Sequence, residues 1–170
     1  MSYERRTEMA TDVLNTSGPW AAYWLAFLRV ITGWWFLHAG LTKFEFIGGS
    51  FGFMWFLKSD SILAPITTWF ATNAPWFVEF MVPIGETLIG LGLIFGVLTR
   101  LAAFFGGFLM VFFFAVNQGW AHGLVNSDLM GLLLFATLIV FGAGRYYGLD
   151  GYLEQTDFVK QRPRLRYLMG

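Results

Sequence analysis

An apolar stretch from Trp76 to Arg100 carries two glutamates, and this combination limits the possible folds of the chain more than any other feature. The stretch is long enough for a helix to cross the hydrocarbon core of a bilayer. At about 100° per residue, Glu79, Glu86 and Arg100 fall within about 40° of one another around that helix. A carboxylate at such depth costs at least about 2.5–3.5 kcal/mol, so Glu86 must face protein or a wet cavity and needs a cationic partner.

The composition is that of a multispanning membrane protein. The chain is 56% hydrophobic, 20% aromatic and only 13% charged, with a mean hydropathy of +0.58, outside the usual range of soluble domains. A net charge of +0 without any basic run argues against nucleic acid as a partner. The sequence has no cysteine, which excludes disulfides, Fe–S clusters and thiol nucleophiles. Redox chemistry would therefore need a bound cofactor, a quinone or a partner subunit.

Hydrophobic segments predict an all-α integral membrane protein. We expect a four-transmembrane-helix bundle with an aromatic interfacial or re-entrant segment between the first and second helices. The membrane domain is predicted at residues 20–145, between an N-terminal tail at 1–19 and a C-terminal tail at 146–170. Within it, the spans are expected at 20–44, 76–99, 101–121 and 125–144, and the aromatic segment at 45–75. The pair Gly92 and Gly96 is a GxxxG signal for close helix packing.

The distribution of cations predicts the orientation in the membrane. With four spans, most lysines and arginines fall on one side, and only Lys43 and Lys58 fall on the other. Because cytoplasmic segments carry the excess of cations, both termini should be cytoplasmic and the 45–75 segment outside. We therefore expect a multi-pass protein of a prokaryotic cell membrane.

Arg29 in the first span is the predicted partner of Glu86. It lies about 14 Å along the helix from Trp20, and Glu86 about 21 Å from Arg100, so a long side chain could cover the difference of about 7 Å. Arg29 shares a helical stripe with Lys43, whereas His38 falls on the opposite side. The pair could be a structural clamp or a catalytic device, and both interpretations stay open.

Three motifs carry a resemblance to a known family. They are LRVITGWWFLHAGLTKF, ETLIGLGLIFGVLTRLAA and GAGRYYGLD, within the range Leu28–Asp150. In this order they resemble the DoxX/DoxD-like membrane family. The resemblance implies a four-helix membrane protein. In the best-understood branch of the family, that protein is the large subunit of thiosulfate:quinone oxidoreductase and works with a small second subunit. Much of the family has no assigned activity.

The functional hypothesis is that electrons pass from a small sulfur compound such as thiosulfate to membrane quinone. A quinone needs an apolar slot with a proton carrier or hydrogen-bond donor at its carbonyls. The candidate catalytic residues are Glu86, Arg29 and His38. The candidate substrate-binding residues are Lys43, Glu79, Trp34, Trp35 and Phe36. Without cysteine, the chain could not form a persulfide with thiosulfate, so electron transfer would be direct or through the partner subunit.

Other interpretations of the same residues compete with this hypothesis. A non-catalytic accessory subunit that stabilises a larger respiratory complex is the alternative, because the sequence has no metal-ligand cluster or nucleophile–base pair. His38 and His122 could in principle hold a haem, but they form no haem motif, and neither haem nor metal is predicted. Helix capping is the ordinary role of residues such as Asn117, Gln118 and Asp128. Arg145 and Asp150 are expected to form a closing turn at the inner interface.

Overall fold

The structure is a computed structural model that describes residues 18–44, 62–116 and 125–170. These residues form helices and no strand, which confirms the all-α class for this part of the chain. The four long helices are α2 (Gly18–Lys43), α5 (Pro75–Phe95), α6 (Thr99–Val116) and α7 (Ser127–Phe141). The short ones are α4 (Ala64–Asn73), η2 (Ala143–Arg145), α8 (Asp150–Leu153), α9 (Asp157–Lys160) and η3 (Pro163–Tyr167).

Two of the helices, α5 and α6, are long and apolar enough to cross a membrane. Helix α7 is apolar but shorter, and α2 is 26 residues long but carries Arg29, His38 and Lys43 among its apolar residues. Large apolar side chains cover the outward surfaces of the long helices; they include Trp34, Leu88, Phe104, Phe108 and Val140. An exposed apolar surface of this kind is suited to lipid contact.

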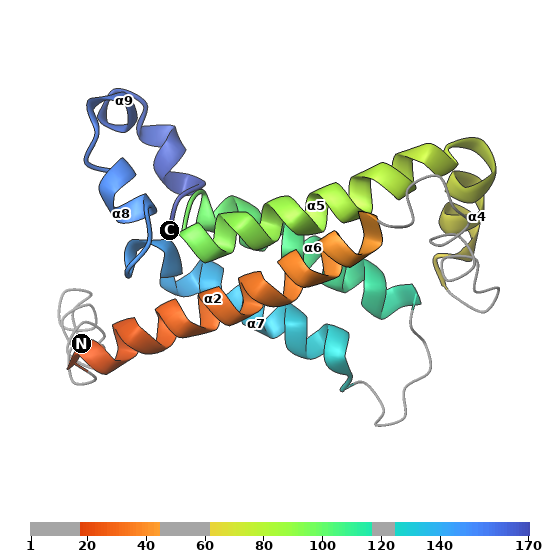
Figure 1. The fold of residues 1–170 in the computed structure, drawn as a ribbon, viewed down its shortest axis with the longest axis horizontal. Helices are drawn as coiled ribbons and strands as arrows, with labels where there is room; N and C mark the ends of the chain where they lie inside the picture. Colours follow the sequence, from red (N-terminus) through yellow and green to blue (C-terminus); the bar gives the residue numbers. More distant parts are fainter. Residues whose placement is uncertain (1–17, 45–61, 117–124) are drawn as a thin grey trace, which may run out of the picture.

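The long helices pack in neighbouring pairs. Helix α2 packs most extensively against α5, and α6 against α7, while contacts between α5 and α6 and between α2 and α7 join the pairs. Figure 1 shows the start of α2, the end of α5 and the C-terminal helices toward one end of the molecule, with α4 at the other. Below, the end that carries α8 and α9 is called the C-terminal end.

Local sequence signals explain where the helices begin and end. Pro75 occupies the first turn of α5, where its missing N–H leaves no bond unmade. Gly96 ends α5 with a φ of 67°, a left-handed conformation that glycine adopts without strain. Asn126 caps α7, because its side chain accepts a hydrogen bond of 2.9 Å from the backbone N–H of Leu129. Gly142 ends α7 with a φ of 59°.

Glycines allow α2 and α5 to approach backbone to backbone. A Cβ added at Gly33 would lie 2.9 Å from the carbonyl oxygen of Gly90, and one added at Gly40 would lie 2.8 Å from that of Pro83. Real Cβ contacts are not this short, so each position requires glycine. The predicted pair Gly92 and Gly96 serves other contacts. Gly92 faces the Ala102 side chain of α6, and Gly96 faces Arg29.

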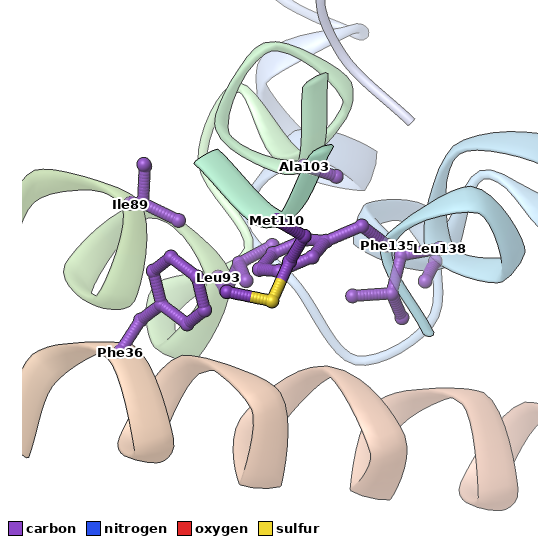
Figure 2. Close-up of a cluster of buried hydrophobic side chains, with 8 residues drawn as sticks. Phe36, Ile89, Leu93, Ala103, Met110, Phe135 and Leu138 are labelled. Atoms are coloured by element: carbon purple, nitrogen blue, oxygen red, sulfur yellow. The ribbon is translucent and has the colours of Figure 1, made fainter. Parts of the chain in front are cut away.

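The hydrophobic core lies where the four long helices meet. Figure 2 shows Phe36 of α2 beside side chains from α5, α6 and α7. The rings of Phe36 and Phe135 meet edge to face, with centroids 4.8 Å apart and planes at 84°. Gly106 leaves room for the Phe135 ring, since a Cβ there would overlap it. The other members of the cluster are Ile89, Leu93, Ala103, Met110, Leu138 and Ala143.

The C-terminal residues, predicted as a tail, are folded against the long helices. The backbone N–H of Leu101 donates to the carbonyl of Leu168 at 3.1 Å. Val159 and Met169 are buried. Of the predicted aromatic segment at 45–75, the described part contains α4, which packs on α5 with the rings of Phe70 and Phe77 stacked. Residues 45–61 lie outside the described part.

Candidate functional site

The central polar feature is an ion pair between the last residue of α2 and the middle of α5. Lys43 Nζ lies 2.5 Å from Glu86 Oε2. The Glu86 side chain is 3% exposed and the Lys43 side chain 26% exposed. The pair therefore joins a buried carboxylate to a cation with partial access to the surface. Lys43 also lies in the last turn of α2, where a positive charge interacts favourably with the helix dipole.

Helix register explains why Lys43 is the partner. Gly40 of α2 lies against Pro83 and Thr87 of α5, so Glu86 is nearly level with Gly40. Lys43 is one helical turn from that level, about 4.5 Å, which a lysine side chain spans with ease. Arg29 is eleven residues from Gly40 in the other direction, about 16 Å along the axis.

The predicted pairing of Arg29 with Glu86 is therefore wrong. The prediction placed Trp20 of α2 and Arg100 at the same depth. In the structure α5 already ends at Phe95, and Arg100 belongs to α6. Gly96, at the end of α5, lies directly against Arg29. The end of α5 is thus level with Arg29 and not with Trp20, and the distance to Glu86 exceeds the reach of an arginine.

Arg29 instead joins α2 to the C-terminal end of the molecule. It is 2% exposed, and its Nη2 donates a hydrogen bond of 3.0 Å to the carbonyl of Tyr147. Its Nε and Nη1 have no hydrogen-bond partner among the described residues. Asp150 is the acidic group whose charge acts on the guanidinium. The glycines at 96 and 148 leave room for Nη1, because a Cβ at either position would overlap it.

Asp150 closes the turn between α5 and α6. Its carboxylate accepts backbone N–H bonds from Leu98 at 2.8 Å, Thr99 at 2.9 Å and Gly170 at 3.2 Å. The first two bonds satisfy N–H groups at the start of α6, where a negative charge is favourable, and the third fixes the end of the chain. Arg145, predicted to act with Asp150, pairs instead with Glu154, with Nη2 and Oε1 at 2.9 Å.

The remaining predicted site residues lie elsewhere on α2 and α5. His38 is exposed and lies about 140° from Lys43 around α2. Trp34 and Trp35 are exposed as well, and Phe36 belongs to the core. Glu79 is partly buried on α5, two turns before Glu86.

Of the four other residues discussed as caps or haem ligands, the structure describes only Asp128. Asp128 is buried in the first turn of α7, where Asn126 is the cap. Asn117, Gln118 and His122 lie outside the described residues. Within the described ranges, no group of three or more His, Asp or Glu side chains could hold a metal ion.

One further polar group beside the ion pair was not predicted. The hydroxyl of Thr87 is buried and has no hydrogen-bond partner among the described residues. Gly40 faces this hydroxyl, because a Cβ there would lie 2.5 Å from Oγ1. Buried polar groups are normally bonded, so an unbonded one marks a place for a water or a ligand. The sequence signal was its position directly after Glu86.

Comparison with known proteins places the chain in a family. Residues 24–123 match the family described as DoxX, a range that holds Arg29, Lys43 and Glu86. No curated protein and no solved structure matches the chain. The family match covers more than half of the 170 residues. The chain therefore belongs to the DoxX family, a family of membrane proteins linked in general to oxidoreductase-associated functions.

Proposed function

We propose that the chain is the membrane subunit of a quinone-reducing oxidoreductase and that Glu86 handles a proton beside the quinone. The supporting observation is a carboxylate, on a side chain that is 3% exposed, in the middle of a helix that can span a membrane, with Lys43 as its ion-pair partner. Ionisable side chains at membrane depth are costly and by default indicate a functional site. Membership of the DoxX family supports the same class of function.

The proposed electron donor is a small sulfur compound such as thiosulfate, as the resemblance to thiosulfate:quinone oxidoreductase implies. The chain has no cysteine, so electrons would pass directly or through a small second subunit. Reducing a quinone to a quinol requires protons as well as electrons. Glu86 would deliver a proton, and Lys43 would stabilise the carboxylate that remains. The partial exposure of Lys43 supplies a route for reprotonation.

The quinone would reach this site from the lipid. Beside Glu86, Gly85 faces open space, since a Cβ there would meet no described atom within 4 Å. The Thr87 hydroxyl, which has no hydrogen-bond partner among the described residues, could bond a quinone carbonyl. Arg29 and His38 have no part in this revised site, because Arg29 is about 16 Å away along the helices and His38 faces outward. Glu79 remains a candidate substrate-binding residue at the entrance to this site.

The proposal includes four spans with both termini on the cytoplasmic side of a prokaryotic cell membrane. The start of α2, the turn between α5 and α6 and the C-terminal helices lie toward one end (Figure 1). That end carries most of the cations of the described chain, among them Arg100, Arg145 and Arg162. The excess of positive charge supports a cytoplasmic location for it.

The test is to purify the full chain from its native membranes together with the chains that bind it. Quinone extraction, identification of the co-purifying chains and thiosulfate-dependent reduction of a short-chain quinone analogue then follow. The proposal predicts bound quinone, a small partner chain and activity that survives the control change Arg145→Gln. Absence of both quinone and thiosulfate-dependent activity in an intact complex would contradict it.

An accessory role in a larger membrane complex is the second candidate. It is favoured by Arg29 and Asp150, since both groups bond to backbone atoms at the C-terminal end. In that case the Lys43–Glu86 pair also has only a structural role, which is to hold α2 against α5. Replacing both members would then leave a folded chain and a fully active host complex, whereas the redox proposal predicts a folded chain and a loss of quinone reduction.

A further inference from the structure

The last part of the chain presents a cluster of exposed cations. Lys160, Arg162, Arg164 and Arg166 are all exposed. In the 3-10 helix η3, successive residues are about 120° apart, so Arg164 and Arg166 project on either side of the half-buried Leu165. Two acidic side chains lie nearby in sequence. Glu154 pairs with Arg145, and Asp157 lies 3.8 Å from Lys160, which leaves the arginines of η3 uncompensated by these groups.

Exposed aromatic side chains accompany these cations. Tyr152, Phe158 and Tyr167 are largely exposed. The Arg162 guanidinium lies 4.4 Å from the centroid of the Phe158 ring. Tyrosines are enriched where an apolar bilayer meets its polar headgroups, because the ring is apolar and the hydroxyl is polar. Three exposed aromatic rings among the cations are more typical of a surface at the membrane interface than of one that contacts only water.

The segment is also held at a fixed place relative to the long helices. Asp150 accepts the N–H of Gly170, the N–H of Leu101 donates to Leu168, and Met169 is buried. In Figure 1, α8 and α9 project sideways from the C-terminal end and do not continue the direction of α5. If α5 crosses the bilayer, a segment placed in this way lies along the membrane surface at headgroup depth.

We infer that residues 145–170 form a platform that binds anionic phospholipid headgroups. The inference rests on the membrane-spanning arrangement proposed above and does not depend on the redox chemistry. Arginine fits phosphate better than lysine does, because its planar guanidinium can donate two parallel hydrogen bonds. Each cation near an anionic membrane surface increases the preference for it about fivefold. Arg162, Arg164 and Arg166 would together give a preference of about a hundredfold.

The test uses the natural absence of cysteine, which makes a single introduced cysteine a unique labelling site. The full chain with Gln161→Cys carries an environment-sensitive fluorophore and is placed in nanodiscs of phosphatidylcholine, with or without phosphatidylglycerol. We expect the blue shift, and the quenching by headgroup-labelled lipid, to be larger when phosphatidylglycerol is present. The triple change R162Q/R164Q/R166Q should remove this difference, and the matched triple change to lysine should keep most of it.

Salt separates failure of the platform from failure of the spanning arrangement. At about 1 M salt the Debye length is about 3 Å, so the lipid preference should disappear while the chain stays in the disc. Equal fluorescence in both lipids, with the chain retained, would overturn the platform and leave the spanning arrangement intact. Release of the whole chain from the discs by salt would overturn the spanning arrangement, and the platform with it.

Discussion

The Lys43–Glu86 ion pair predicts an unequal cost for the removal of its two members. We consider Lys43→Gln, Glu86→Gln and the double change. Lys43→Gln leaves a carboxylate that is 3% exposed with no cation beside it. Glu86→Gln leaves an ammonium on a side chain that is already 26% exposed and flexible enough to extend to the surface.

These environments set the expected magnitudes. Breaking a buried pair by removing one partner costs about 3–5 kcal/mol, and Lys43→Gln should fall in this range or force Glu86 to take up a proton. Glu86→Gln should cost about 1–2 kcal/mol, since a charge-assisted hydrogen bond is lost but the cation is resolvated. In the double variant no charge remains at this site, so part of the Lys43→Gln loss should be recovered.

Thermal unfolding in detergent, followed by the fluorescence of the eight tryptophans, measures these differences. The exposed pair Arg145–Glu154 serves as the matched control, and its double-mutant cycle should give no more than about 1 kcal/mol. The reasoning is refuted if Glu86→Gln costs as much as Lys43→Gln, or if the double variant is less stable than both single variants.

The remaining predictions concern packing, the α5–α6 turn and orientation. Gly90→Ala should lower the free energy of unfolding by about 1–3 kcal/mol, because its Cβ would overlap the α2 backbone. In the control Gly85→Ala the new Cβ faces open space, so this change should be neutral or stabilising by up to about 1 kcal/mol. Thermal unfolding compares the two variants. Asp150→Asn should destabilise the fold by about 1–3 kcal/mol, since the amide would place an NH₂ donor against at least one of the three backbone N–H groups. An unchanged midpoint of thermal unfolding contradicts the role assigned to this carboxylate. In sealed cells, an impermeant thiol reagent should label Thr72→Cys of α4 and spare Lys160→Cys; the reverse pattern contradicts the proposed orientation.

The class of fold was predictable because it depends on composition and segment length. Apolar runs long enough to span predicted α5 and α6, although the predicted span ran through Gly96 to residue 99 and α5 ends at Phe95. The need of Glu86 for a cation was predictable too, since the cost of a buried charge does not depend on the details of packing.

The identity of that cation was not predictable, because register between helices depends on where each helix ends. The prediction measured depth from Trp20 and Arg100. In the structure α5 ends at Phe95, and the next residue lies beside Arg29 and not beside Trp20, which puts Glu86 out of the reach of Arg29. The positions of Gly33 and Gly40 indicate the correct register between α2 and α5. Their spacing on the face that meets α5 sets the level at which the two helices touch.

The folded C-terminal segment was missed for a different reason. Polar composition after residue 145 is typical of a tail, whereas the contacts that order it are long-range. Asp150 bonds to Leu98 and Thr99, some fifty residues earlier, and no local pattern in the sequence indicates such contacts. Arg145 was assigned to Asp150 on proximity in sequence, although one turn further along Glu154 was equally available.

The central claim, that Glu86 handles a proton for quinone reduction, is tested most directly by one rate comparison. The full complex in membranes is assayed for thiosulfate-driven reduction of a quinone analogue, per mole of folded chain, with wild type, Glu86→Asp and Glu86→Gln. General acid–base catalysis is worth about 10²–10⁴-fold, so Glu86→Gln should lose activity to that extent and Glu86→Asp should retain part of it. A Glu86→Gln complex that folds and reduces quinone at close to the wild-type rate contradicts the claim.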